Sequence, residues 1–330
     1  MIIKNIGEFK KIDIKDKEVF LDYFQKFPQQ FCDLNLFNLL SWSIVYDYYW
    51  TIYEERLIIY NKSTDFIFKP VGEPFSLNEI LYVSDSFISS NLSGNFCFFD
   101  EDYIRNLEVQ NQNEKSLNKF FNLIESKDNA NYIYFTEKLA LLSGRKFHKK
   151  RNLISQFMRY YPKFNVTILD RSNSDCKEFR RCVELAEKWA KNKAKTGTNE
   201  NVEQSENKDL EKDSSSEKEL LEIELKVLKN SCNYFKELDI GLIIIEFDSS
   251  IIAFSVFSKQ NQDMATIHFE KFDINYIGIP QVINNITSKH LLQKYKYINR
   301  EDDLGIAELR FAKKSYYPDI LLIPYNLVRK

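Results

Sequence analysis

The sequence predicts a mixed α/β fold arranged in two domains. Segments with helical periodicity alternate along most of the chain with short runs of β-branched and aromatic residues, which is typical of sheets covered by helices. A length of 330 residues is typical of two domains. The apolar fraction of 44% and the aromatic fraction of 15% are enough to build a core in each domain, so a disordered chain is excluded.

The first domain is expected to cover residues 1–140. Helical periodicity predicts helices over residues 17–27 and 36–46. Residues 48–60, YYWTIYEERLIIY, contain two strand-like runs around a polar centre, which is a hairpin signal. The other elements expected in this domain are strands at 65–69, 96–99 and 132–135, and helices at 77–90 and near 114–125.

Residues 136–160 are predicted to form one long helix, in which Gly144 marks a kink or a break. Residues 145–163 contain seven basic residues and no acids, namely Arg145, Lys146, Lys149, Lys150, Arg151, Arg159 and Lys163. This pattern is consistent with a solvated helix face. It is equally consistent with a docking surface for phosphates, since binding there would release counterions.

The second domain is expected to cover residues 141–330. Residues 196–216 are polar and of low complexity, so they are predicted to be a disordered acidic insertion within this domain. The expected helices are 176–191, 217–238, 280–292 and 304–316, and the expected strands are 165–169, 241–247, 251–258, 265–272, 297–298 and 321–328.

The net charge of −2 is unevenly distributed along the chain. Residues 197–224 contain ten acids and three lysines, so the remainder of the chain is mildly basic. Mild basicity permits an anionic partner such as tRNA, phospholipid or CoA without requiring one.

Cysteine usage and hydropathy indicate a cytoplasmic protein. The five cysteines form no CxxC pair and are odd in number, so neither a disulfide framework nor a zinc site is expected. The first residues lack the apolar core of a signal peptide, and no apolar run is long enough to span a membrane.

Several common catalytic motifs are absent. The eight glycines form neither a GxGxxG nor a P-loop pattern, which excludes the usual nucleotide cradles. The sequence contains no GxSxG elbow and no HExxH. The three histidines are too far apart in sequence to predict a metal site, and none is expected.

A polar corner at residues 299–303, NREDD, follows a short predicted strand and precedes a predicted helix. Acidic residues at such a junction commonly cap the helix and match its dipole. The same arrangement of three carboxylates beside an arginine is also typical of a functional rim, and the residues alone leave both interpretations open.

The predicted order of helix, hairpin, strand, helix and strand is that of the acyltransferase fold known as GNAT. In members that use acetyl-CoA, a glycine-bearing turn before a helix offers backbone N–H groups to the pyrophosphate. Here that connection, FDINYIGIPQV at 272–282, has one glycine and a proline that lacks a donor. A CoA pyrophosphate would be held poorly, so acetyl-CoA is a less favoured cofactor.

Five ordered stretches resemble the C-terminal domain family of phosphatidylglycerol lysyltransferases, most closely its stand-alone soluble branch. They are LALLSGRKFHKKRNLISQF (139–157), TIHFEKFD (266–273), GIPQVINN (278–285), YINREDDLG (297–305) and LRFAKKSYYP (309–318). The resemblance implies two tandem GNAT-like domains and transfer of an aminoacyl group from aminoacyl-tRNA to a lipid head group such as phosphatidylglycerol. The sequence departs from the full lysyltransferase by lacking a membrane-embedded region. It would therefore have to reach a lipid acceptor from the membrane surface.

Such a transfer needs a base, a donor for the oxyanion and groups that hold the donor's α-ammonium. The resembling stretches place the candidate catalytic residues at Glu270, Arg300, Glu301 and Asp302. Candidate substrate-binding residues are His148, Lys149, Lys150, Arg151, Asn284, Asn299, Lys313, Ser315 and Tyr316.

Each candidate residue also has a structural interpretation. Glu270 would pair with Lys271 or a neighbouring strand, Asn284 would lie on a helix surface, Lys313 would be exposed, and His148 would pack against the core.

The preferred function is therefore an aminoacyltransferase with aminoacyl-tRNA as donor and no bound cofactor. Peripheral contact with anionic lipid at the inner membrane face is a further expectation. The alternatives are a CoA-dependent N-acyltransferase and a non-catalytic protein of this fold that binds RNA or anionic lipid through residues 145–163.

Overall fold

The computed structural model describes residues 1–109, 116–170, 176–196 and 208–330. By the density of its contacts the chain divides into two compact units. Unit 1 comprises Met1–Thr136, Lys259–Thr266 and Lys294–Lys330, and unit 2 comprises Glu137–Ser258 and Ile267–Gln293.

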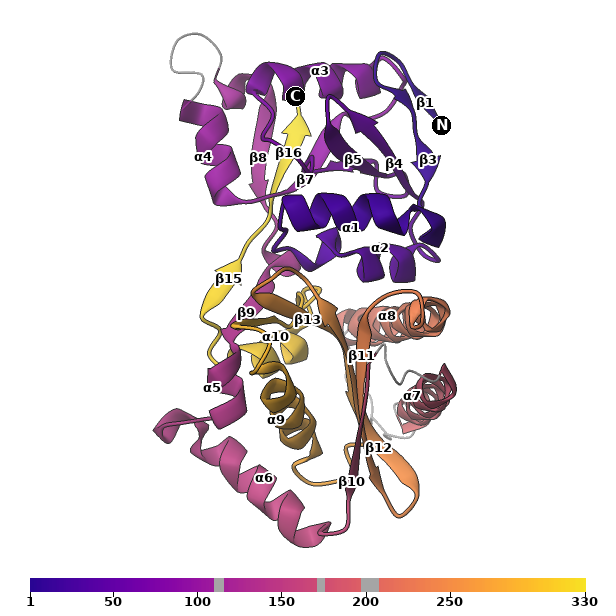
Figure 1. The fold of residues 1–330 in the computed structure, drawn as a ribbon, viewed down its shortest axis with the longest axis vertical. Coiled ribbons are helices and arrows are strands. Elements are labelled where there is room, and N and C mark those ends of the chain that lie inside the picture. Colours follow the sequence, from indigo (N-terminus) through magenta and orange to yellow (C-terminus); the bar gives the residue numbers. More distant parts are fainter. Residues whose placement is uncertain (110–115, 171–175, 197–207) are drawn as a thin grey trace. The chain divides into compact units, whose positions relative to one another are not determined.

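One mixed sheet of seven strands lies within unit 1, in the order β3-β4-β5-β6-β7-β16-β8 (Figure 1). Its strands are β3 (Lys10–Lys11), β4 (Tyr48–Tyr53), β5 (Arg56–Asn61), β6 (Phe66–Phe68), β7 (Asn95–Phe99), β16 (Tyr325–Arg329) and β8 (Phe121–Glu125). The predicted hairpin at 48–60 is confirmed as β4 and β5, joined by Glu54 and Glu55 with positive φ. A short ribbon of β1 (Ile2–Ile3) and β2 (Gly7–Glu8) precedes this sheet.

A second mixed sheet of seven strands has the order β10-β11-β12-β13-β14-β9-β15. Its strands are β10 (Asn165–Leu169), β11 (Ile240–Phe247), β12 (Ser250–Lys259), β13 (Met264–Phe272), β14 (Tyr297–Asn299), β9 (Asn131–Phe135) and β15 (Ile320–Leu322). Strands β9, β14 and β15 belong to unit 1. Strands β10, β11 and most of β12 belong to unit 2, and β13 contributes to both.

The two sheets repeat one topology. In each, a parallel pair is joined through a crossover helix: β6 and β7 through α3 (Leu77–Ile88), and β13 and β14 through α9 (Ile279–Leu291). The helix, hairpin, strand, helix and strand order predicted for a tandem GNAT-like fold of mixed α/β class is thereby confirmed.

Each sheet also contains one strand from a distant part of the chain. β16, the last strand, lies between β7 and β8 of the first sheet, and β9 lies between β14 and β15 of the second. The predicted domain boundary at residue 140 differs from the observed division for this reason, since residues 294–330 belong to unit 1. The single strand predicted at 321–328 is instead two strands in different sheets, separated at Pro324.

The remaining helices of unit 1 are short. They are α1 (Lys17–Lys26), α2 (Leu36–Trp42), α4 (Glu101–Val109) and α10 (Ala307–Lys314). The core of the first sheet is rich in aromatic side chains, because Phe96, Phe99 and Phe121 pack edge to face around β7 and are fully buried.

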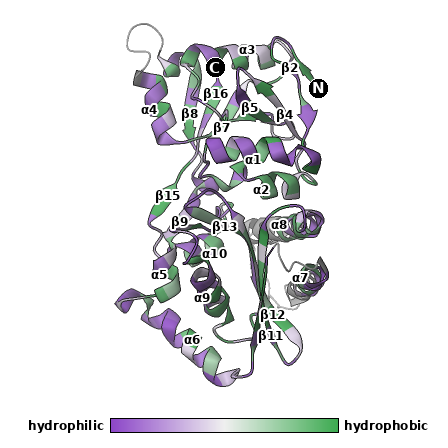
Figure 2. Ribbon diagram, in the orientation of Figure 1, coloured by the Kyte–Doolittle hydropathy of each residue, from purple (hydrophilic) through white to green (hydrophobic). Residues whose placement is uncertain are grey.

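In unit 2, helices cover both faces of β11 and β12 (Figure 1). On one face are α7 (Cys176–Thr196) and α8 (Lys208–Ser231), and on the other is α9, which packs against α6 (His148–Tyr160). The strands are apolar and the outer helices are mostly hydrophilic (Figure 2). Phe254 contacts Trp189 of α7, whereas Phe257 contacts His290 of α9, so alternate residues of β12 face opposite helices.

Several predicted elements need correction. The helix predicted at 136–160 is not continuous but consists of α5 (Thr136–Leu141), a 3₁₀ turn and α6. The break predicted at Gly144, where φ is +88°, is confirmed. The helix predicted near 114–125 is wrong where the structure has β8, while residues 110–115 lie outside the described residues. Helix α8 begins at Lys208, inside the segment predicted to be disordered, and residues 197–207 of that segment are also not described.

Within the described residues, no helix combines the length and the apolar character that crossing a membrane requires.

Candidate active site

Three acidic side chains of unit 1 meet at the end of β14. Glu301 and Asp302 lie in the loop between β14 and α10, and Asp33 lies in the 3₁₀ turn Cys32–Leu34. Asn38 bonds to both segments and, besides burial, the charges of Asp302 and Glu301 both raise the pKa of the Asp33 carboxyl. We call Asp33, Glu301 and Asp302 the acid cluster.

Asparagine side chains hold the two segments of the acid cluster together. Asn38 Nδ2 donates to the Cys32 carbonyl at 3.0 Å and to Glu301 Oε1 at 2.8 Å. Asn131 Oδ1 accepts from the Cys32 amide and from Asn299 Nδ2, both at 2.8 Å. These amides are buried and bonded to both segments, so they fix the 3₁₀ turn against the loop.

The backbone of Glu301 is strained, with φ at +58° in the left-handed region. Its amide donates to Asn299 Oδ1 at 2.7 Å, and its carbonyl accepts from the Tyr132 amide at 3.1 Å. Strain of this kind persists where the surroundings determine the conformation, often at functional sites. The capping interpretation is wrong for Glu301 and Asp302, because α10 begins only at Ala307 and its N-cap, Ile306, makes no side-chain cap.

Two members of the acid cluster titrate near neutral pH. Burial raises the pKa of Asp33 from 3.8 to about 8, and the charges of Asp302 and Glu301 raise it further. Burial also raises the pKa of Asp302 from 3.8 to about 7, against an opposing effect of Lys313. Both carboxyls therefore exchange protons in the range where acid–base catalysis operates.

A lysine and an arginine accompany the acid cluster. Lys313 of α10 donates from Nζ to the Asp302 carbonyl and lies 5.8 Å from the Tyr132 ring. Burial lowers the pKa of Lys313, so this side chain is not the exposed lysine that the structural interpretation predicted. The Arg300 guanidinium lies 5.1 Å from the ring of Tyr316, which is itself buried.

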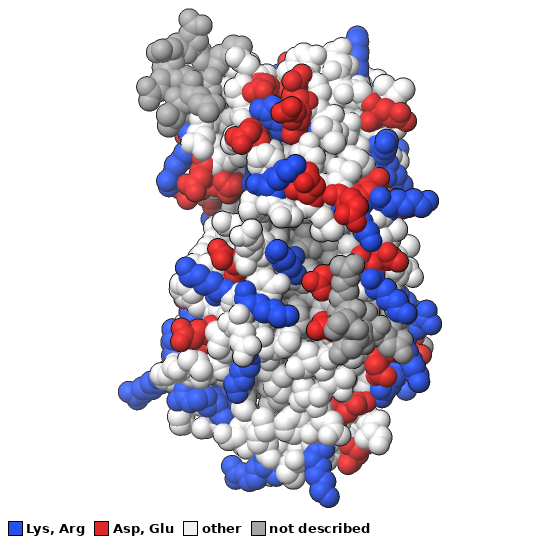
Figure 3. Space-filling view, in the orientation of Figure 1, with Lys and Arg blue, Asp and Glu red and all other residues white. Residues whose placement is uncertain are grey.

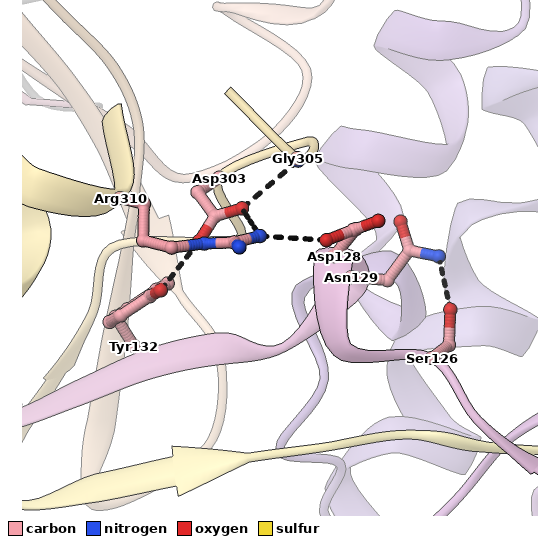
Figure 4. Close-up of polar contacts among 7 residues, drawn as sticks. All are labelled: Ser126, Asp128, Asn129, Tyr132, Asp303, Gly305 and Arg310. Carbon is pink, nitrogen blue, oxygen red and sulfur yellow. Dashed lines mark hydrogen bonds and ion pairs between the residues drawn. The ribbon is translucent and has the colours of Figure 1, made fainter. Parts of the chain in front are cut away.

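The next residue in the loop has a different environment (Figure 4). Asp303 is fully buried and accepts from Arg310 at 2.9 Å and 2.8 Å, from the Tyr132 hydroxyl at 2.5 Å and from the Gly305 amide at 2.9 Å. Arg310 also donates to Asp128 at 2.7 Å. Burial alone would raise the pKa of Asp303, but these hydrogen bonds outweigh it and the pKa is lowered. Asp303 is thus a satisfied structural carboxylate.

In unit 2, Glu270 of β13 is half-buried and accepts from Asn284 Nδ2 of α9 at 3.3 Å. The pairing with Lys271 considered from sequence is not observed, because Lys271 bonds to Glu224 at 2.6 Å. Asn284 does not lie on a helix surface but is fully buried against the sheet.

Several basic side chains of unit 2 lie over α6 and the turn before it, and others lie over α7 and α8 (Figure 3). Lys149 and Arg159 are exposed, and His148 is exposed rather than packed against the core. Lys150 is half-buried. Arg151 has a structural task, since it donates to the carbonyls of Leu142 at 2.5 Å and Gly144 at 2.8 Å at the end of α5.

In unit 2, helix α6 packs closely against the N-terminus of α9. A side chain on Gly278 would lie 2.2 Å from the Leu153 carbonyl of α6, so only glycine permits this approach. Pro280 in the first turn has no N–H to offer. Among the described residues, no group of three His, Cys, Asp or Glu side chains is arranged to hold a metal ion.

The model of the family described as phosphatidylglycerol lysyltransferase, C-terminal, matches residues 24–326. The chain belongs to this family. The resemblance expected from the five sequence stretches is thereby confirmed.

Solved structures with this fold include two bacterial proteins. A conserved protein of unknown function from Bacteroides thetaiotaomicron has 25% identity and a TM-score of 0.81, with 100% of both chains covered. The C-terminal domain of a putative lysylphosphatidylglycerol synthetase from Agrobacterium fabrum has 12% identity and a TM-score of 0.61, covering 96% of this chain and 92% of that one. Comparison with curated proteins gives no match.

Membership of the lysyltransferase C-terminal family, together with the GNAT-like fold, supports an acyltransferase. The structure brings together five of the predicted site residues in unit 1, namely Asn299, Arg300, Glu301, Asp302 and Lys313, and Tyr316 packs under Arg300. Ser315 donates to the Ala312 carbonyl at 2.6 Å. Glu270, Asn284 and the basic residues at 148–151 belong to unit 2.

The sequence analysis missed Asp33 and the asparagines Asn38 and Asn131. Their signal in the sequence is weak, because a single Asp in FCDLNLFN looks like a turn residue before a helix. Only the fold, which places this turn beside the NREDD corner, reveals its role.

Proposed function

We propose that this protein is an aminoacyltransferase that moves an aminoacyl group from aminoacyl-tRNA to a lipid head group such as phosphatidylglycerol. The observation that carries the proposal is the acid cluster, in which the pKa values of Asp302 and Asp33 are raised to about 7 and about 8. Two carboxyls that titrate one after the other near neutral pH are typical of an acid–base pair.

The chemistry asks for two proton transfers. The acceptor hydroxyl attacks the ester carbonyl and loses its proton, the bond to the tRNA 3′ oxygen breaks, and that oxygen gains a proton. We assign Asp302 as the base, since it is the more easily ionised of the two. Asp33 holds its proton at neutral pH and would donate it to the leaving oxygen.

Positive charge beside these carboxyls would stabilise the tetrahedral oxyanion and the phosphates of either substrate. Lys313 and Arg300 are the candidates, because both lie at the acid cluster and neither is fully exposed. Asn299 would act as a positioning residue through its bond to the Glu301 amide. Tyr316 would support Arg300, whereas Ser315 only closes the end of α10.

The basic surface of α6 supports a polyanionic donor. Among the described residues, no ion pair is found for Arg145, Lys149, Arg159 or Lys163, and all four are exposed. Charges without a local partner are free to bind phosphates and to release counterions. His148 and Lys150 lie on the same helix and would extend this surface.

The direct test is transfer of label from the twenty aminoacyl-tRNAs to total lipid, followed by chromatography of the lipids. We expect one labelled lipid from one or a few amino acids, and loss of that product with Asp302→Asn. Absence of labelled lipid from every pool would contradict the proposal and favour a non-catalytic protein that binds RNA or anionic lipid.

The CoA-dependent alternative has less support. Leu153 packs against the N-terminus of α9, where a pyrophosphate would need open backbone donors, and Pro280 removes one of them. Calorimetry with acetyl-CoA tests it, and tight binding would reverse the order of the two proposals.

A further inference from the structure

Three buried side chains of unit 2 each carry an oxygen atom without a hydrogen-bond partner. They are Ser255 Oγ of β12, Asn284 Oδ1 of α9 and Thr287 Oγ1 of α9, and each residue has 0% exposure. A buried polar group without a partner destabilises a fold, because it has lost its hydrogen bonds to water. Three such oxygen atoms in one unit are unusual, and the packing of the fold does not explain why they are kept.

These oxygen atoms share one layer, between α9 and the sheet. Asn284 and Thr287 are three residues apart and therefore lie on one face of α9. Ser255 is two residues from Phe257 on β12, and Phe257 contacts His290 on α9. Ser255 therefore points toward α9 as well.

A carboxylate borders the same layer. Glu270 accepts from Asn284 Nδ2 at 3.3 Å, and it is only half-buried, whereas the three oxygen-bearing residues are fully buried. Glu270 thus supplies negative charge at the partly open edge of the layer. We call Ser255, Glu270, Asn284 and Thr287 the oxygen pocket.

The composition of the oxygen pocket selects its ligand. Carboxylate and amide oxygens only accept hydrogen bonds, and the hydroxyl oxygens can accept as well. A primary ammonium has three N–H donors and no acceptor, and its charge needs a carboxylate partner when it is buried. An anion would meet the negative charge of Glu270 and is therefore disfavoured.

We propose that the oxygen pocket binds a primary ammonium group, with Glu270 as its counter-charge. The inference goes beyond the proposed function, because it assigns to unit 2 a site for a small primary amine, independently of the acid cluster in unit 1. Binding of a small amine can be measured without any transfer reaction.

The experiment is calorimetric titration of the full chain with alaninamide, and with N-acetylalaninamide, which lacks the ammonium. We expect binding of the first and none of the second. Thr287→Val keeps the shape of the side chain and removes one acceptor, so binding should weaken about 10-fold or more, the loss of a hydrogen bond to a charged group. Glu270→Gln should abolish binding.

The matched control is Ser288→Ala. Ser288 neighbours Thr287 and is equally buried, but its hydroxyl already donates to the Asn284 carbonyl at 2.7 Å. Its loss should leave amine binding unchanged. Thr287→Val should also leave the melting temperature unchanged or higher, since it removes an unpaired hydroxyl.

Equal binding of the acetylated amide, displacement of alaninamide by K⁺ or Na⁺ at equal concentration, or unchanged binding in Thr287→Val would each overturn the inference. Transfer to lipid without amine binding would reject the oxygen pocket and keep the proposed function. Amine binding without transfer would keep the oxygen pocket and reject the proposed function.

Discussion

Asp302 and Asp303 are consecutive residues in one loop, yet their environments are opposite. Asp303 is bonded to Arg310, Tyr132 and the Gly305 amide, and its pKa is lowered. Asp302 is half-buried in the acid cluster, and its pKa is raised to about 7. A carboxylate whose hydrogen-bond partners are all present stabilises the fold. A carboxylate placed among like charges destabilises the fold, and its raised pKa allows it to exchange a proton during a reaction.

The largest effect expected from this contrast is on transfer. Asp302→Asn and Asp33→Asn should each lower the rate of aminoacyl transfer about 10²–10⁴-fold, the usual contribution of a general acid or base. Neither variant should lose stability at pH 8, because a buried carboxyl among like charges does not stabilise the fold there. Initial rates with labelled aminoacyl-tRNA measure the first statement, and urea unfolding measures the second. Full activity in either variant would remove that residue from the mechanism.

The second largest effect is on stability, and it distinguishes Asp303 from Asp302. Asp303→Asn should lower the free energy of unfolding by about 1.5–3 kcal/mol, the range for hydrogen bonds to a charged group. Asp302→Asn is the matched control, one position away and with the same chemical change. Equal losses in the two variants would show that the two acids do not differ in the way described.

The pH dependence of stability sharpens the comparison further. The Asp33 carboxyl has its pKa raised from 3.8 to about 8, so the folded state keeps a proton that the unfolded chain has lost. The unfolded state then binds fewer protons across this window, and stability falls as pH rises from about 4 to about 8. Asp33→Asn should remove that decline, so the variant should gain stability relative to the parent between pH 5 and pH 8. A constant difference across this range would contradict the raised pKa.

The smallest expected effect concerns unit 2. The double variant Lys149→Ala, Arg159→Ala should weaken binding of tRNA and lower the slope of log K against log salt by about 1 for each charge removed. Lys11→Ala is the control, because Lys11 is ion-paired with Asp47 at 2.6 Å in unit 1 and should leave the slope unchanged. Fluorescence anisotropy at several salt concentrations measures both.

Local patterns predicted most of the secondary structure. Runs of alternating or apolar residues predicted β4, β5 and β10 to β13, and helical periodicity predicted α3 and α9. The positions of β9 and β16 within their sheets could not be predicted from the sequence, because strand pairing between distant segments leaves no local pattern.

The acid cluster was only half predictable. The NREDD corner carries three acids in sequence, but nothing in the sequence tells that Arg310 bonds to Asp303 and not to Asp302. Asp33 enters the cluster through the asparagine network of Asn38, Asn131 and Asn299, whose members come from three separate segments. Contacts of such long range are decided by the fold.

The account depends on carboxyl groups that hold protons near neutral pH. A carbon-13 NMR titration of the aspartate carboxyls in the full chain measures this directly, with Asp33→Asn and Asp302→Asn to assign the signals. We predict two coupled titrations with midpoints near pH 7 and pH 8, and a third aspartate, Asp303, that stays ionised to low pH. Midpoints near pH 4 for both Asp33 and Asp302 would contradict the account.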